Sequence, residues 1–261
     1  MMKFIFVNLK RFDIPREKGG ICDTGNPVLW IKKIMKESAG IKGARLIYFL
    51  PEALIIPAVE EKPENIEIGS QSVYREDLEP GGNFGAFTSQ FPAIAAAYYG
   101  CTWSMIGHSE ERKDKDNKIL NQQIKCADNI GLKILYCVGE KKEELGRKYD
   151  VIKSQLAMGL RNIKGKVVIG YEPVWAIGPG RTPPGADFIA NISKFIKRTV
   201  KKEYGYEPRV VYGGGLKVEN AAEIASIDSI DGGLIALTHF TGNVGFSTDG
   251  LKKIIKKYLE V

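Results

Sequence analysis

The sequence contains few residues of the kinds that bind metals or form disulfides. Its 261 residues include two histidines and four cysteines, and no two cysteines form a C-x-x-C pair. We therefore expect no metal centre, and Cys101, Cys126 and Cys137 are expected to be reduced residues in apolar or helical surroundings. No apolar run approaches the ~20 residues of a membrane span. No small-residue cleavage site follows the apolar run near the start, so we expect a cytoplasmic protein.

The charge pattern also lacks the features of nucleic-acid binding. The net charge is +7, but the lysines are spread along helical patterns, and the densest group, within 252–257, has the spacing of one solvated helix face. There is no basic arm with interleaved aromatics. We therefore expect neither a nucleic acid nor a membrane as partner. A positive field still attracts small anionic substrates.

What the sequence does contain is a repeated pattern of a short apolar, β-rich run and a helical stretch. Expected strands span 3–9, 45–50, 66–72, 102–107, 133–138, 167–171, 209–212 and 233–237. Expected helices include 27–38, 118–129, 143–162, 186–204 and 251–260, and Gly131, Gly165 and Gly205 follow helical stretches, as C-terminal glycines do. Eight such units without a linker predict an α/β fold, a single (β/α)8 barrel domain over residues 1–261. The alternative, an open doubly wound sheet, predicts a glycine-rich turn after the first strand, and residues 8–12 contain no glycine.

Polar residues follow several of these expected strands. Asn8 and Lys10 follow the first, His108 the fourth and Glu172 the sixth. The carboxyl ends of barrel strands meet at one mouth, where barrel enzymes place their chemistry. A lysine, a histidine and a glutamate at that mouth suit proton abstraction beside a carbonyl in an anionic small molecule. Each also has a plainer interpretation, as a surface lysine, a core histidine and an ion-paired glutamate.

Three segments resemble the triosephosphate isomerase family: IGHSEER at 106–112, CVGE at 137–140 and YEPVWAIGPGRT at 171–182. Weaker matches are NLK at 8–10, GAFT at 85–88 and YGGG at 212–215. The resemblance extends over nearly the whole chain. It implies a (β/α)8 homodimer of glycolysis and gluconeogenesis that needs no metal or cofactor. Such an enzyme interconverts an aldose and a ketose phosphate, glyceraldehyde 3-phosphate and dihydroxyacetone phosphate, through an enediolate.

The resemblance also implies a role for each matching residue. Glu172 would be the base that moves a proton between adjacent carbons, and His108 the electrophile that hydrogen-bonds the substrate oxygens. Lys10 would supply positive charge, and Asn8 would orient Lys10 and a substrate oxygen. The positions implied to bind the phosphate are Gly178, Gly215, Ala236 and Leu237. Those implied to form the lid and its hinge are Trp175, Ile177, Pro179, Gly180 and Tyr212.

Other positions are implied to be structural or to lie between subunits. The loop from Gly85 to Thr88 would reach into a second subunit, with Thr88 near Asn8 or Lys10 of the partner subunit. Glu140 is expected to be an ion-pair partner. Glu111 replaces a family arginine to which we assign a structural role.

The sequence departs from the family pattern at the phosphate end. Ala236 and Leu237 stand where the family has two glycines, and Gly215 stands where it has serine. Glycine lets a backbone approach a ligand closely, and a leucine side chain obstructs such an approach. Loops 13–26 and 74–84 are longer than usual, and Arg11 and His239 are candidates to donate to the anion instead. Two alternatives stay open: isomerisation of a related sugar phosphate, such as a tetrose phosphate, and a non-catalytic barrel with a binding role.

Overall fold

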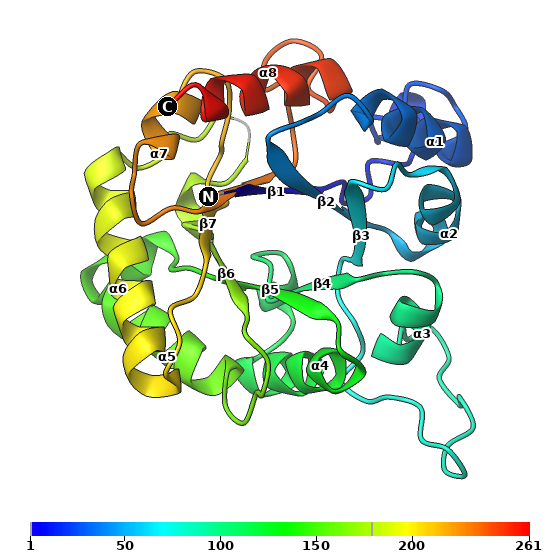
Figure 1. The fold of residues 1–261 in the computed structure, drawn as a ribbon, viewed down its shortest axis with the longest axis horizontal. Helices are drawn as coiled ribbons and strands as arrows, with labels where there is room; N and C mark the ends of the chain where they lie inside the picture. Colours follow the sequence, from blue (N-terminus) through cyan, green and yellow to red (C-terminus); the bar gives the residue numbers. More distant parts are fainter. Residues whose placement is uncertain (1, 179) are drawn as a thin grey trace.

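The computed structural model describes residues 2–178 and 180–261 and contains a closed barrel of eight parallel strands (Figure 1). Each strand pairs with the next along the chain, and β8 pairs with β1. The strands are β1 (Lys3–Asn8), β2 (Ala44–Leu50), β3 (Ile66–Ser70), β4 (Trp103–Ile106), β5 (Lys133–Val138), β6 (Val168–Tyr171), β7 (Val210–Tyr212) and β8 (Gly232–Ile235). The predicted (β/α)8 fold is confirmed.

Helices surround the barrel on all sides (Figure 1). They are α1 (Pro27–Ser38), α2 (Glu52–Glu61), α3 (Ala93–Tyr98), α4 (Asn117–Ile130), α5 (Lys148–Gly159), α6 (Ala186–Tyr204), α7 (Ala221–Ala225) and α8 (Thr248–Leu259). Short 3-10 helices are η1 (Arg16–Lys18), η2 (Glu111–Lys113), η3 (Lys142–Arg147) and η4 (Val174–Ala176). None of the helices within residues 2–178 and 180–261 is long and apolar enough to cross a membrane.

The structure corrects two details of the helix prediction. The stretch 143–162 is divided into η3 and α5, which ends at Gly159. Gly165 therefore does not cap a helix, because the chain turns earlier, at Asn162, whose φ is 60°. Gly131 and Gly205 do cap α4 and α6 in the left-handed conformation.

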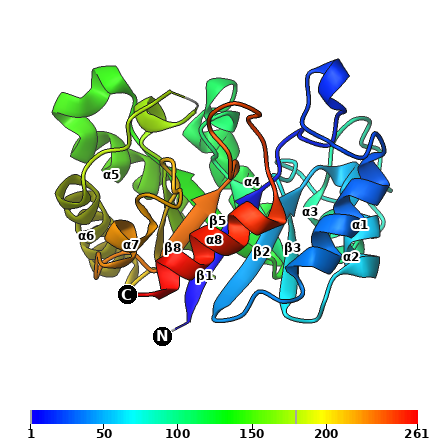
Figure 2. The same cartoon turned by 90° about the horizontal axis from the view of Figure 1, so that it is seen from above.

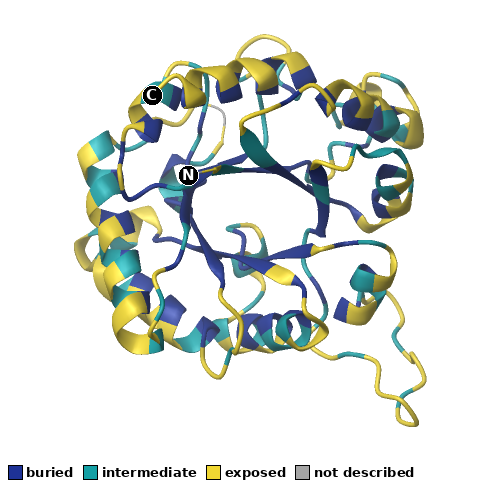
Figure 3. Ribbon diagram, in the orientation of Figure 1, coloured by how far each residue is buried: buried dark blue, intermediate teal, exposed yellow. Residues whose placement is uncertain are grey.

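The barrel strands are largely buried (Figure 3), and the alternation of their side chains produces two hydrophobic cores. In β1, Ile5 and Val7 pack in the core shared with the helices, whereas Phe6 packs in the barrel interior. The interior core contains Phe6, Ile47, Phe49, Trp103, Met105, Leu135, Cys137, Val168, Val211 and Leu234. Because side chains repeat with period two, Asn8 lies on the same side of β1 as Phe6. The strand thus directs Asn8 into the carboxyl-terminal mouth of the barrel.

The loops that follow the strands rise at one end of the barrel, opposite the chain termini (Figure 2). The loop after β1, which contains η1, contacts the loop after β8, since Arg16 Nη1 donates to the carbonyl of Val244 at 3.2 Å. The loop between β3 and α3 extends away from the barrel (Figure 1). At the other end, the Lys3 ammonium donates to the carbonyl of Ile230 at 3.1 Å and lies 5.9 Å from the ring of Tyr258 in α8.

A charged cluster closes the amino-terminal end of the barrel around Glu67. Its carboxylate accepts hydrogen bonds from Arg45, from Lys133 Nζ at 2.7 Å and from Trp103 Nε1 at 3.0 Å. Burial raises the pKa of Glu67, but these hydrogen bonds outweigh burial and lower the pKa from 4.5 to about 2. A carboxylate whose pKa is lower in the folded state stabilises the fold at pH values above its pKa in the unfolded state. This contribution is lost as the pH falls toward its pKa in the folded state.

We therefore expect Glu67→Gln to lower the free energy of unfolding by about 1–3 kcal/mol at neutral pH, since hydrogen bonds to a charged group are lost. The difference from wild type should shrink progressively as pH falls below 4.5. Urea denaturation of wild type and variant at several pH values measures the difference in the free energy of unfolding and its change with pH. Glu64→Gln, an exposed carboxylate on the preceding turn, is the control. A difference that is the same at pH 3.5 and pH 7 would contradict the assignment.

Candidate active site

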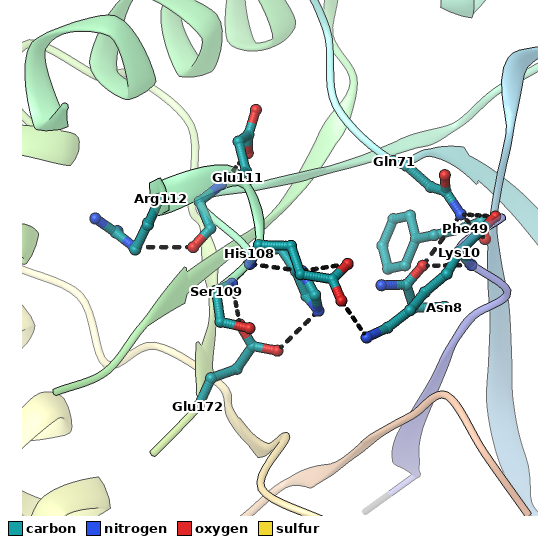
Figure 4. Close-up of polar contacts among 11 residues, drawn as sticks. Asn8, Lys10, Phe49, Gln71, His108, Ser109, Glu111, Arg112 and Glu172 are labelled. Carbon is teal, nitrogen blue, oxygen red and sulfur yellow. Dashed lines mark hydrogen bonds and ion pairs between the residues drawn. The ribbon is translucent and has the colours of Figure 1, made fainter. Parts of the chain in front are cut away.

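The ends of β1, β4 and β6 bring Asn8, Lys10, His108 and Glu172 to one cavity of about 270 Å³ (Figure 4). Glu172 and His108 point toward one another, and the Lys10 side chain approaches from the other side (Figure 4). The four residues are separated by up to 164 positions in the sequence, and the order of the barrel strands brings them together.

The hydrogen bonds of His108 distinguish its two ring nitrogens. It is 6% exposed, and its Nδ1 accepts the backbone N–H of Glu110 at 3.2 Å. A ring nitrogen that accepts a hydrogen bond carries no proton, so this contact assigns the proton of the neutral ring to Nε2. Nε2 lies 3.3 Å from Oε1 of Glu172. The ring therefore presents an N–H group toward the glutamate and the cavity.

Glu172 is a buried carboxylate held by the same turn that carries His108. It is 3% exposed, and its Oε2 accepts the backbone N–H of Ser109 at 2.9 Å. Its own N–H donates to the carbonyl of Val138 at 2.8 Å, which continues the pairing of β5 and β6. Pro173 disfavours helix at the preceding residue and so keeps Glu172 extended at the strand end. The carboxylate is thereby fixed beside His108.

Lys10 is positioned by Asn8 at the end of β1 and by Gln71 just after β3. Its φ is 41°, an uncommon value for a residue with a side chain, and its N–H donates to Asn8 Oδ1 at 3.0 Å. Gln71 Nε2 donates to the same Oδ1 at 3.1 Å and to the Lys10 carbonyl at 3.0 Å. Lys10 Nζ lies 2.8 Å from Oε1 of Glu110. Burial raises the pKa of Glu110, but the hydrogen bond and charge of Lys10 outweigh it, so the net pKa is lowered.

The far end of the cavity keeps backbone donors and gains apolar side chains. Gly178, Gly215, Ala236 and Leu237 all line it. Within the described chain, the N–H groups of Gly215, Ala236 and Leu237 donate to no protein acceptor, so they remain available for an anion. The apolar residues of the lining are Phe12, Ile177, Leu216, Leu234, Ile235, Ala236, Leu237 and Phe240. Of the described residues that line the cavity, Lys10 is the only lysine or arginine.

Arg11 and His239 lie elsewhere. Neither belongs to the lining of this cavity. Arg11 Nη2 pairs with Oδ2 of Asp13 at 3.0 Å and lines a second cavity beside Lys10. His239 lies in a small hairpin in which its N–H donates to the carbonyl of Gly245 at 3.0 Å. The structure therefore does not support either residue as the replacement anion donor.

The segment after Glu172 is anchored through a buried carboxylate. Glu140 Oε1 accepts hydrogen bonds from Trp175 Nε1 at 2.8 Å and from the Tyr171 hydroxyl at 3.1 Å. Burial raises the pKa of Glu140 despite these bonds. The ion pair expected for Glu140 is absent from the described residues, and these hydrogen bonds take its place.

The other expected lid residues have different surroundings. Ile177 and Gly178 line the cavity, whereas Gly180 is exposed and lies outside it. Tyr212 is buried, and its hydroxyl donates to the carbonyl of Gly214 at 2.8 Å rather than to the lid. Pro179 lies outside the described residues.

A model of the family "Triosephosphate isomerase" matches residues 23–247. The chain belongs to the triosephosphate isomerase family. Three curated relatives carry that name. The one from Dictyoglomus thermophilum is 34% identical over 218 residues, 79% of this chain and 85% of the relative. The one from Pelodictyon phaeoclathratiforme is 35% identical, with 79% and 82% covered. The one from Lawsonia intracellularis is 32% identical, with 86% and 89% covered.

The fold comparison agrees with this family. The crystal structure of triosephosphate isomerase from Bartonella henselae superposes with a TM-score of 0.80 at 24% identity and covers 99% of each chain. At this identity the likeness concerns the fold.

Part of the cavity wall is formed by residues that the family motifs do not include. These residues are Phe12, Leu216, Leu234 and Phe240. Alternation was the available signal for Leu234, because it precedes Ala236 by two positions and side chains two apart in an extended segment lie on the same side. Phe12 and Phe240 lie in loops, where alternation gives no direction.

Proposed function

We propose that this chain interconverts glyceraldehyde 3-phosphate and dihydroxyacetone phosphate. The observation that carries the proposal is the triad of a carboxylate, a neutral imidazole N–H and an ammonium at one cavity, with free backbone N–H groups at its far end. A base, an oxyanion donor and an anion site are what an aldose–ketose isomerisation of a phosphorylated substrate requires.

The reaction is a proton transfer between adjacent carbons. The Glu172 carboxylate takes the proton from the carbon next to the carbonyl, and the electron pair left behind moves toward the carbonyl oxygen. The Nε2–H of His108 and the ammonium of Lys10 stabilise the negative charge on that oxygen. The proton of the neighbouring hydroxyl passes to the former carbonyl oxygen, and Glu172 returns its proton to the former carbonyl carbon, so that the carbonyl group now lies on the adjacent carbon. A positioned general base contributes ~10²–10⁴-fold to such a step.

Substrate binding requires the base to turn. Nε2 of His108 and Oε1 of Glu172 are 3.3 Å apart, which leaves no room for a substrate atom between them. The carboxylate therefore releases His108 and the N–H of Ser109 and rotates into the cavity when the carbonyl oxygen takes the Nε2–H. Ile177 and Gly178 line the cavity and follow Glu172 by five and six residues, so movement of the lid and of the base is linked through the chain.

A coupled assay on triose and tetrose phosphates, run with wild type and Glu172→Gln, tests the proposal. We expect turnover of triose phosphate by wild type and its loss in the variant. Turnover of the tetrose phosphate alone favours the alternative substrate. A protein without activity on either substrate contradicts the proposal.

The phosphate end gives a separate prediction. If Ala236 and Leu237 obstruct a triose phosphate, Ala236→Gly with Leu237→Gly should lower KM for it by about one to two decades, the value of one charge-assisted hydrogen bond. The value of kcat should change little, because the reacting groups are untouched. Steady-state kinetics measure both constants.

The matched control is Ala225→Gly with Leu259→Gly. These two residues lie in α7 and α8, outside the cavity. If the cavity variant binds triose phosphate no better than wild type, the side chains do not obstruct the phosphate. In that case the backbone donors of Gly215, Ala236 and Leu237 serve the anion as they stand.

We also infer a homodimer. The loop between β3 and α3 extends from the barrel, and it exposes Thr88 and 86% of Phe84. A cavity of about 190 Å³ lies on another side of Lys10, lined by Asn8, Lys10, Arg11, Gln71, Met105, His108, Glu110 and Glu111. A protruding loop and a recess beside the site suit reciprocal insertion by two copies.

Sedimentation tests this dimer. We expect a dimer at micromolar concentration in wild type. Thr88→Arg should produce monomers, because it brings a cation toward Lys10 of the partner subunit. Ser226→Arg, on an exposed position after α7, should leave the dimer intact. Wild-type protein that sediments only as a monomer would count against the inference.

A further inference from the structure

Glu111 lies close to His108 (Figure 4), and its carboxylate binds donors from three segments of the chain. Its Oε2 accepts the backbone N–H of Gly107 at 2.6 Å. Its Oε1 accepts the Ser72 hydroxyl at 2.5 Å and pairs with Lys115 Nζ at 2.7 Å. The side chain is 9% exposed. A largely enclosed carboxylate with donors from the end of β4, from the segment after β3 and from the link between η2 and α4 fixes these segments relative to one another.

The contact with Gly107 sets the start of the turn that carries the site. The φ of Gly107 is 79°, and a Cβ there would lie 2.8 Å from the carbonyl oxygen of Cys137, so only glycine fits. The next residues of the turn place two further N–H groups: that of Ser109 binds Glu172, and that of Glu110 binds His108. The direction of the Gly107 N–H therefore governs where both of these donors point.

The contact with Ser72 ties this turn to the segment that holds Lys10. Ser72 Oγ also accepts a hydrogen bond from Gln123 Nε2 at 3.0 Å, so the Ser72 side chain is held from a second side. The preceding residue, Gln71, hydrogen-bonds Asn8 and the carbonyl of Lys10. Through Ser72 and Gln71, Glu111 fixes the position of His108 relative to Lys10 across the mouth of the barrel.

We propose that Glu111 is a positioning residue for His108. Its carboxylate holds residues 107–110 in the conformation in which the N–H of Glu110 keeps Nδ1 unprotonated and Nε2–H faces the reacting oxygen. This inference rests on the proposed function, in which His108 polarises the substrate carbonyl. Glu111 itself does not line the substrate cavity, so it acts through the turn.

The test is Glu111→Gln, which keeps the shape and removes the charge. An amide supplies one acceptor oxygen where the carboxylate supplies two, and its NH₂ group then faces Gly107 N–H or the donors of Ser72 and Lys115. We expect kcat to fall by about tenfold or more, equivalent to ~1.4 kcal/mol, with KM within about threefold of wild type. The matched control is Lys115→Gln, which removes the ion pair and leaves the contacts with Gly107 and Ser72.

The second measurement is the ¹⁵N spectrum of the histidine rings. The chain has two histidines, so His239→Gln assigns the signals of His108 directly. Protonated and unprotonated ring nitrogens give well-separated signals. We expect wild type and Lys115→Gln to show one protonated nitrogen, Nε2, and Glu111→Gln to show a mixture of tautomers or an altered Nδ1 signal. A purely structural role would not change the tautomer of folded protein.

The inference is overturned if folded Glu111→Gln keeps kcat within twofold of wild type. It is also overturned if kcat falls while the His108 ring signals stay as in wild type. Should Glu111→Gln not fold, Glu111→Asp, which keeps the charge and withdraws the carboxylate by one methylene, is judged by the same two criteria. The spectrum needs no substrate, so a wild type without isomerase activity refutes the proposed function and still leaves the positioning role testable.

Discussion

Glu172→Gln is expected to lower kcat by at least ~10²-fold with a small change in KM, since a base acts mainly in the transition state. The amide keeps the shape of the side chain but cannot accept the proton. It also offers one acceptor to two donors, the N–H of Ser109 and the Nε2–H of His108, which both bind the carboxylate in wild type. Exchange of the carbon-bound substrate proton with solvent, followed by NMR in deuterium oxide, should disappear in the same variant.

The matched control for this variant is Glu223→Gln, an exposed carboxylate in α7. It should retain wild-type kinetics and proton exchange. Near wild-type turnover by Glu172→Gln, in protein free of host isomerase, would refute the assignment of the base. Loss of turnover with proton exchange retained would place the defect in a later step than proton abstraction.

His108→Gln is expected to lower kcat by ~10²–10³-fold, the usual effect of removing a preorganised donor to an oxyanion. Glutamine carries an N–H donor, but it has no ring nitrogen for the N–H of Glu110 to bind, so its amide is not held in one direction. Lys10 would then stabilise the oxyanion alone. Single-turnover kinetics with saturating enzyme separate this loss from any change in substrate binding.

His239→Gln is the control for His108→Gln, because it changes the other histidine of the chain and lies outside the cavity. It should retain kcat and KM. A His108→Gln variant within tenfold of wild type would mean that Lys10 and the backbone carry most of the stabilisation, and the assigned electrophile would then be wrong.

The architecture was predictable because the pattern of each strand and of the long helices is regular. Strands covered on both faces are continuous apolar runs, and eight such runs predicted the barrel. The helices α1 and α6 were predicted with the bounds that the structure has. The helices α3 and α7, with six and five residues, are too short for a helical period to be recognised. Pro57 inside α2 disguises that helix, because an internal proline ordinarily ends one.

The identity of the candidate site residues was predictable, and their interactions were not. Strand ends and motif residues indicated His108 and Glu172, because both follow strands directly. The hydrogen bond from Ser109 to Glu172 joins residues 63 positions apart and depends on the conformation of the turn after β4. The bonds from Trp175 and Tyr171 to Glu140 likewise depend on packing that no local pattern encodes.

The closure of the barrel between β1 and β8 makes the order of its strands cyclic. Lys3 in β1 contacts Ile230, just before β8, and lies beside Tyr258 in the last helix, so the first and last segments meet at the amino-terminal end, away from the cavity. A circularly permuted chain, joined there by a short linker and opened in the loop between β3 and α3, would keep every strand pair. Such a chain would bring Asn8 and Lys10 from its second half and His108 and Glu172 from its first. The site is thus a property of the closed ring of strands and does not depend on where the chain begins.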